Sequence, residues 1–336
     1  MLLRWPMGRS AHARWLAWQG VASCIGRGDG HGSIMFNTGH TGIEDDCIER
    51  VVRWHRVRPV FMLHDLIPIT HPQFCRPGEA ERHELRVRNM LRLGAGIVLN
   101  SQSTLGELSR FAQGHGLRVP PTLVAPLAPA LLRGAAVDSA PELARPASDL
   151  LPAQPYFVAL GTVEPRKNHA ILLQVWQQLV AIRGERAPHL VIVGQRGWQS
   201  EHVEGLLERG EGFGGRVTAL RDCSDERLGE LLDGACALLF PSFVEGYGLP
   251  VVEALAAGTP VIASRLPVLR EIAGDVPDYL DPHDSAAWLA RVQDYAGADS
   301  PARAAQRVRM DGFAPATWQE HFERVDRFVA TIDADR

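Results

Sequence analysis

The sequence predicts an α/β protein with two domains, each a parallel sheet wound with helices on both faces. Two observations carry this prediction. Short apolar runs alternate with longer stretches of helical periodicity through both halves of the 336 residues, which is typical of βαβ units. The alternation is broken once, over residues 126–155, a stretch rich in proline and alanine. Such a composition is typical of a domain boundary.

The first half of the chain contains four predicted strands. In open α/β sheets, ligand groups lie at the carboxyl ends of the strands, and the second strand delivers His64 and Asp65 there. A lone histidine is more often structural, but this position favours a functional His64, with His40 and His71 as weaker candidates. The predicted strands are 33–37, 59–63, 97–99 and 122–125, and the predicted helices are 44–55, 78–93 and one from the N-cap residues 100–103 to 111.

The second half repeats the alternation. Its predicted strands are 156–160, 190–193, 217–220, 236–240 and a run after Gly258, and its predicted helices are 168–182, 201–209, 225–233, 249–257, 267–273 and 286–295. A last helix is predicted over 315–332, with Trp318, Phe322 and Phe328 at a spacing that suits a core face. We therefore expect domains at 1–128 and 155–314, a linker at 129–154 and a C-terminal helical segment at 315–336.

Composition narrows the class of protein. A net charge of −4 gives no electrostatic footprint for nucleic acid. The five cysteines include no C-x-x-C pair, so neither a zinc site nor a disulfide framework is indicated, and a reducing cytosol is the natural compartment. No apolar run has the length of a membrane span, and the first residues lack the apolar region of a signal peptide. We expect a soluble, cytoplasmic protein.

Residues 1–20 leave two interpretations open. Trp5, Trp15 and Trp18 stand among arginines, a pattern typical of an amphipathic helix on an anionic membrane face. The other interpretation is a helix that packs its tryptophans against its own domain.

Residues 240–264 combine a strand, a loop, a helix and a second strand. Glu245 lies in the loop, and glycines at 246 and 248 permit positive φ and a close approach of the backbone to a ligand. The helix begins at Leu249, and free amides at a helix start bind anions. Glu245 and Glu253 can accept hydrogen bonds from a polyhydroxylated ligand whose phosphates rest at that start. The alternative is an ordinary crossover with two solvated glutamates.

Residues 161–168 hold two adjacent cations, Arg166 and Lys167, between a strand end and a helix start. A guanidinium for bidentate contact next to an ammonium is typical of a diphosphate clamp, and the alternative is an exposed basic turn. Residues 194–198 follow the next strand, and Trp198 either stacks on a base or fills the core. Residues 220–222 end the strand after that, and we expect them to line a base pocket, chiefly through backbone groups.

The string from Glu245 to Glu253, with Gly-Tyr-Gly-Leu-Pro inside it, resembles the E-x7-E signature of the retaining GT-B glycosyltransferases grouped as family 4. Residues 61–68 and 97–101 are similar to acceptor-domain segments of this family, and the resemblance covers residues 35–312. It implies a GT-B architecture of two Rossmann-like domains that face a cleft, with a last helix that crosses back. Because nothing before Ser33 matches the strand and glycine-rich loop that open such proteins, we expect an N-terminal domain that lacks its first strand.

The resemblance also implies an activity and the roles of single residues. The activity is retaining transfer of a sugar, mannose on a loose likeness, from a GDP- or UDP-linked donor to a hydroxyl acceptor in polysaccharide or lipid-linked glycan biosynthesis. Many members carry the arginine directly after the glycine, where this chain has Thr162. The implied roles are catalysis for His64 and Glu245; diphosphate binding for Arg166, Lys167 and Leu249; donor-sugar binding for Glu245, Gly246, Tyr247 and Gly248; and ribose binding for Glu253.

We expect no metal and no cofactor, because the only D-x-D is Asp333-Ala334-Asp335 at the tail, so Arg166 and Lys167 would replace a bridging cation. The expected partners are a nucleotide-sugar donor, a glycan or lipid-linked acceptor and, peripherally, the inner face of the cytoplasmic membrane, without nucleic acid. Two rival functions remain. A dinucleotide-dependent oxidoreductase would need a G-x-G-x-x-G after a strand, which the chain lacks. A noncatalytic or truncated sugar-nucleotide-binding remnant would bind the donor without turnover.

Overall fold

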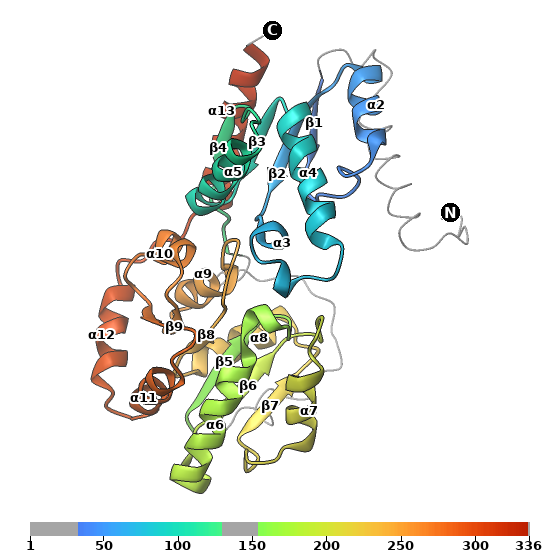
Figure 1. Cartoon of the computed structure of the whole chain (residues 1–336). Helices are drawn as coiled ribbons and strands as arrows, with labels where there is room; N and C mark the ends of the chain where they lie inside the picture. The colour runs from blue at the N-terminus through green and yellow to red at the C-terminus, as the bar shows by residue number, and fades with distance from the viewer. Residues whose placement is uncertain (1–32, 130–153, 335–336) are drawn as a thin grey trace, which may run out of the picture. The chain divides into compact units, whose positions relative to one another are not determined.

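The structure, a computed structural model, describes residues 33–129 and 154–334 (Figure 1). The chain divides into two compact units. Unit 1 comprises the residues up to Pro126 together with those from Gln319 onward, and unit 2 runs from Leu127 to Trp318. The amphipathic pattern of residues 1–20, most of the expected linker and Asp335 of the D-x-D lie outside the described residues.

Unit 1 is built on a four-stranded parallel sheet with the strands in chain order. The order is β1 (Ile34–Asn37), β2 (Arg58–Leu63), β3 (Gly96–Leu99) and β4 (Thr122–Val124). The connections are α2 (Asp46–His55), α3 (Ile67–Thr70), the 3-10 turn η1 (Pro72–Phe74), α4 (Glu79–Leu93) and α5 (Gln102–Gly114). The predicted parallel sheet is confirmed. The expected loss of a first strand stays a prediction, because residues 1–32 are not described.

The two faces of this sheet are covered by different parts of the chain. Phe61 and Leu63 pack with buried residues of α2, α4 and α5. The opposite face, with Val60 and Val98, is covered by α13 (Trp318–Ala334) through Val325, Phe328 and Ile332, and the helix lies beside β3 and β4 in Figure 1. The close approach depends on Gly96, because a Cβ there would lie 2.5 Å from the Cδ1 atom of Ile332.

The sequence placed the wrong aromatic residues on the core face of this last helix. Trp318 and Phe322 are 43% and 56% exposed, and only Phe328 of the three packs against the sheet. The helix also begins at Trp318 rather than at Pro315. The inward face is fixed by contact with β2 and β3, and a spacing of aromatic residues alone does not identify that face.

Unit 2 holds a six-stranded parallel sheet whose strand order reverses at its centre. The order is β10 (Asp278–Leu280), β9 (Val261–Ser264), β8 (Leu238–Phe240), β5 (Tyr156–Leu160), β6 (His189–Val193) and β7 (Val217–Leu220). The chain thus runs outward from β5 to β7, returns to β8 on the other side of β5, and runs outward again. In such sheets, ligands bind outside the carboxyl ends of the strands at the point of reversal, which here lies between β5 and β8.

Alternation along β5 sends successive side chains to two separate cores. Phe157 and Ala159 pack with α6 (His169–Arg183) and α11 (Ser285–Tyr295). Tyr156 and Val158 pack with buried residues of α8, α9 and α10. The other helices and 3-10 turns of unit 2 are η3 (Pro165–Lys167), η4 (Gly184–Arg186), α7 (Glu201–Arg209), α8 (Asp225–Gly234), α9 (Leu249–Ala256), α10 (Pro267–Ala273) and α12 (Pro301–Met310).

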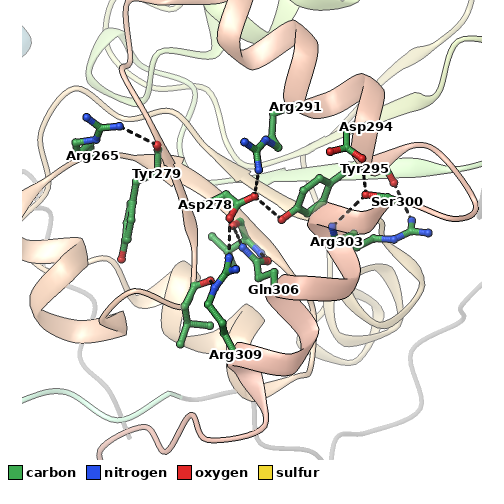
Figure 2. Close-up of polar contacts among 12 residues, drawn as sticks. Arg265, Asp278, Tyr279, Arg291, Asp294, Tyr295, Ser300, Arg303, Gln306 and Arg309 are labelled. Carbon is green, nitrogen blue, oxygen red and sulfur yellow. Dashed lines mark hydrogen bonds and ion pairs between the residues drawn. The ribbon is translucent and has the colours of Figure 1, made fainter.

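The outer strand β10, which the sequence did not predict, is tied to the helices by one carboxylate. Asp278 accepts a hydrogen bond of 2.8 Å from the Tyr295 hydroxyl and forms ion pairs with Arg291 and Arg309, the second at 2.6 Å (Figure 2). These three partners come from α11 and α12. The Asp278 cluster, defined as Asp278, Arg291, Tyr295 and Arg309, therefore fastens an edge strand to the helices that follow it.

Three of the described cysteines, Cys47, Cys223 and Cys236, are free thiols. None of the described helices combines the length and the apolar character that crossing a membrane requires.

Candidate functional site

The loops that follow β5 and β8 are bonded to each other at the point where the strand order reverses. The amide of Phe243, after β8, donates to the carbonyl of Arg166, after β5, over 2.9 Å. The Asn168 side chain donates to the carbonyls of Pro241 and Pro282 at 3.1 and 2.9 Å. Asn168 was predicted as the first helical residue, but it has φ +54°, and α6 begins only at His169. Asn tolerates this left-handed conformation well.

Glu245 receives both cations of the first loop. Its Oε1 atom lies 2.6 Å from Nζ of Lys167, and its Oε2 atom lies 2.9 Å from Nη1 of Arg166. The Glu245 side chain is 7% exposed. Burial alone would raise the pKa of this carboxyl, but the adjacent Lys167 and Arg166 outweigh burial and hold the pKa below its usual value. Glu245 is therefore ionised at neutral pH.

Arg166 is held from two sides. Its Nε and Nη2 atoms donate to Oε1 of Glu164 at 3.1 and 2.8 Å. Its Nη1 atom donates to the carbonyl of Val244 at 3.2 Å and to Glu245. Burial would lower the pKa of Arg166, but Glu245 and Glu164 raise it. The sequence indicates a diphosphate role for Arg166 but gives no sign of Glu164, because a pairing within one loop has no periodic signal.

Glycines permit the close packing of the strand ends at this site. Gly161 has φ +137°, and a Cβ there would lie 3.3 Å from Cε of Lys167. A Cβ on Gly194, at the end of β6, would lie only 2.0 Å from the carbonyl oxygen of Gly161. Lys167 also places its ammonium 4.8 Å from the centroid of the Phe240 ring. Glycine is therefore required at both positions for the Lys167 loop to adopt this course.

The turn at residues 246–248 leads directly into α9. Gly248 has φ +108°, and a Cβ there would lie 2.5 Å from the side chain of Leu269. The buried Tyr247 donates its hydroxyl to the carbonyl of Leu127 at 2.8 Å, and burial raises the pKa of the phenol to about 12. The Tyr247 hydroxyl is therefore already engaged within unit 2. Leu249 is the first residue of α9, and the half-buried Glu253 follows one turn later.

The segments expected to surround a base lie at the ends of β6 and β7. Arg221 donates to the carbonyl of Gly194 at 3.0 Å and pairs with Glu204 of α7. Gln195 donates to Asp222 at 3.1 Å. Trp198 is half-buried and belongs to neither core of unit 2, so stacking on a base and packing both stay hypotheses.

His64 lies in unit 1, in a group of three histidines at the carboxyl end of β2. Its Nε2 atom lies 2.8 Å from the carbonyl oxygen of Thr38, and since a carbonyl only accepts, Nε2 carries a proton. The ring of His40 lies 5.0 Å from that of His64 and 5.4 Å from that of His83. Burial, followed by the effect of His64 and His83, lowers the pKa of His40 to about 4.

The sequence singled out two of these three histidines and missed His83, which is 3% exposed and donates from Nε2 to the carbonyl of Asp65 over 3.0 Å. His71 contacts Thr70 and the Phe74 ring instead. In the described part of the chain, no three His, Cys, Asp or Glu residues are grouped so as to hold a metal ion. Metal independence stays a prediction.

Comparisons with known proteins agree with this architecture. The model of the family described as glycosyl transferases group 1 matches residues 142–303. Sucrose-phosphate synthase from Thermosynechococcus elongatus has the same fold, with a TM-score of 0.67 and 20% identity over 96% of this chain and 77% of that one. The chain thus has the GT-B fold, and its residues 142–303 match the group 1 glycosyl transferase model.

Two further proteins are similar to this chain, one in sequence and one in fold. The O-antigen chain mannosyltransferase B of Escherichia coli is 32% identical over 241 residues, which are 71% of this chain and 61% of that protein. This chain therefore spans less than two thirds of that relative. Anabaena HepE, solved in complex with UDP, has a TM-score of 0.63 at 17% identity over 94% of this chain and 80% of its own. At such identity the likeness to HepE concerns the fold alone.

Proposed function

We propose that this chain transfers a sugar from a nucleotide diphosphate sugar to a hydroxyl acceptor, with retention, in the biosynthesis of a polysaccharide or lipid-linked glycan. The observation that supports this best is the ionised Glu245 between Arg166 and Lys167, next to the start of α9 and at the reversal point of the sheet. Mannose is the proposed sugar because a 32% identical relative is a mannosyltransferase.

Each part of this site has a task in the proposed reaction. The departing diphosphate gains negative charge, which Lys167 and the amides at the start of α9 stabilise electrostatically. Glu253 takes the ribose hydroxyls, and Glu245 takes hydroxyls of the donor sugar. The acceptor oxygen bonds to the anomeric carbon on the face from which the diphosphate leaves, and the acceptor proton passes to a diphosphate oxygen. His64 serves the reacting centre, as the family resemblance implies.

We further propose that the donor is GDP- or UDP-linked, that no metal or cofactor takes part, and that the acceptor is reached at the inner face of the cytoplasmic membrane. A fold shared with the UDP-bound HepE is compatible with either nucleotide. The noncatalytic remnant remains the second candidate, and it predicts donor binding without transfer.

Calorimetric titration with GDP, UDP and ADP, each with and without magnesium, tests the donor site. We expect one nucleotide to bind selectively without the metal. Failure of all three to bind a folded protein would contradict the proposal. A transfer assay with the matching sugar nucleotide then separates an enzyme from the remnant, and His64→Ala should bind the nucleotide normally but transfer the sugar more slowly.

A further inference from the structure

The proposed diphosphate site carries no net charge in this structure. Two cations, Arg166 and Lys167, face two carboxylates, Glu164 and Glu245. The exposed fractions of the side chains are 20% for Arg166, 12% for Lys167, 21% for Glu164 and 7% for Glu245. Such shielded charges interact strongly. An incoming diphosphate thus meets cations that the protein's own carboxylates already neutralise, and it has to compete with one of them.

The two cations differ in how firmly they are held. Arg166 makes four hydrogen bonds with a guanidinium that has five N–H groups. An arginine fork of this kind is rigid, and turning it to a ligand would break contacts with Glu164, Val244 and Glu245 together. The Lys167 ammonium has three donors and one hydrogen bond to a described residue, the one to Glu245. Moving Lys167 therefore breaks a single hydrogen bond.

The amino-acid composition separates Lys167 further. Among the 35 lysine and arginine residues of the chain, Lys167 is the only lysine. Every other basic residue of the two types is an arginine, so the lysine at this position is an exception in the composition of the chain. A lysine ammonium is a compact charge with freely rotating donors, whereas an arginine would pair with a carboxylate in a fixed bidentate geometry. The choice suits a cation that changes partner.

We propose that Arg166 is a positioning residue that fixes Glu245, and that Lys167 exchanges Glu245 for the diphosphate of the donor. The inference rests on the proposed function. The exchange releases Oε1 of Glu245, while Oε2 stays on Arg166. A hydroxyl of the donor sugar then takes the place of the ammonium on Oε1. Diphosphate and sugar recognition are coupled in this way through one lysine.

The coupling gives the site a preference for the loaded donor over the spent nucleotide. A nucleoside diphosphate without a sugar removes the Lys167 ammonium from one oxygen of a 7% exposed carboxylate, which costs free energy. A sugar hydroxyl supplies a hydrogen bond in place of the ammonium. Because Lys167 and Arg166 keep the pKa of Glu245 below its usual value, neutral pH does not relieve the competition.

Glu245→Gln and Glu164→Gln make a matched pair for testing the exchange. Each removes one carboxylate from the same cluster, but only Glu245 contacts Lys167. We expect Glu245→Gln to bind GDP about tenfold more tightly than the wild type, which is about 1.4 kcal/mol, and to lose much of its preference for GDP-mannose over GDP. Glu164→Gln should change GDP affinity less than threefold and keep the preference. If UDP is the nucleotide that binds, UDP and the matching UDP-sugar are used in place of GDP and GDP-mannose.

Lys167→Arg keeps the charge and tests the type of cation. We expect it to weaken GDP binding at least tenfold, because a bidentate pair with Glu245 releases less readily. Lysine labelled with ¹³C gives a readout that needs no variant, since the single lysine supplies one Cε signal. That signal should shift when wild-type protein is saturated with GDP.

The exchange is overturned if GDP binds folded Glu245→Gln no more tightly than wild type, if Glu164→Gln tightens binding equally, or if the Lys167 signal is unmoved at saturation. Should Glu245→Gln not fold, the labelled wild-type protein and Lys167→Arg decide the matter. Wild-type protein that binds neither GDP nor UDP would instead refute the proposed function, and the exchange with it.

Discussion

The Glu245 and Asp278 clusters of unit 2 each hold two cations on one carboxylate, and they differ in position and partners. Glu245 is 7% exposed and joins the loops after β5 and β8. Asp278 is 14% exposed and joins the edge strand β10 to α11 and α12. The Glu245 cluster includes a lysine at the reversal point of the sheet, whereas the Asp278 cluster uses arginines and a tyrosine. Charge alone thus does not distinguish the proposed ligand site from a cluster that holds an edge strand to its helices.

The largest effect should come from the Asp278 cluster, and it should be on stability. Asp278→Asn leaves Arg291 and Arg309 facing each other without a carboxylate. We expect the free energy of unfolding to fall by about 3 kcal/mol, as measured by urea denaturation. GDP affinity should stay unchanged, since the cluster lies on an edge strand. A large loss of GDP affinity in folded protein would show that the two clusters are not functionally distinct.

Lys167→Ala should have the opposite effects, a large loss of GDP affinity and a small change in stability. Removing the ammonium should weaken GDP binding by about 30- to 100-fold, or about 2–3 kcal/mol, as expected for a lost charge-assisted hydrogen bond. The free energy of unfolding should change less than in Asp278→Asn, because Arg166 still pairs with Glu245. Calorimetry on the two variants side by side makes the measurement. Equal GDP affinities for Lys167→Ala and wild type would remove Lys167 from the site.

Lowering the pH should reduce the free energy of unfolding through His169, which lies next to the Lys167 loop. Burial first, then Lys167 and Arg221, lower the pKa of His169 to about 4. Between pH 6.5 and 4 the unfolded chain binds a proton that the folded chain does not, so stability falls as the pH falls. From pH 7 to 5 this amounts to about 2 kcal/mol. The usual range of Glu lies below this window, so Glu245 does not contribute to the loss.

His169→Phe removes the titrating group and keeps a ring of similar size. Urea unfolding at both pH values should show a loss between pH 7 and 5 that is about 2 kcal/mol smaller than in the wild type. An identical loss in both proteins would contradict the assignment to His169.

The smallest effect concerns the turn beside Glu245. Tyr247→Phe removes only the hydrogen bond to the Leu127 carbonyl, so the free energy of unfolding should fall by about 1 kcal/mol. GDP affinity should change less than threefold, because the hydroxyl that is removed is already bonded to Leu127. Thermal unfolding and calorimetry on one preparation measure both. A tenfold loss of affinity would assign the phenol to the site.

The sequence by itself predicted most elements within a few residues, because alternating short apolar runs and helical stretches are local signals. It failed for β10 and α12, and the four-residue α3 fell in a stretch expected to be an irregular loop. It also selected Arg166, Lys167, Glu245 and the start of α9 as candidate site groups, because glycine-rich turns and strand ends are readable from residue types alone.

Only the tertiary structure decided which of these groups touch. Lys167 and Glu245 are 78 positions apart in the chain, and they meet because β5 and β8 are neighbours in the sheet. The pairing of these strands also brings Arg166 to Glu245. In unit 1, packing against a different sheet turns Phe328, rather than Phe322, inward. Periodicity specifies which face of an element is apolar, whereas pairing between distant side chains depends on strand order and close packing, which a local pattern does not contain.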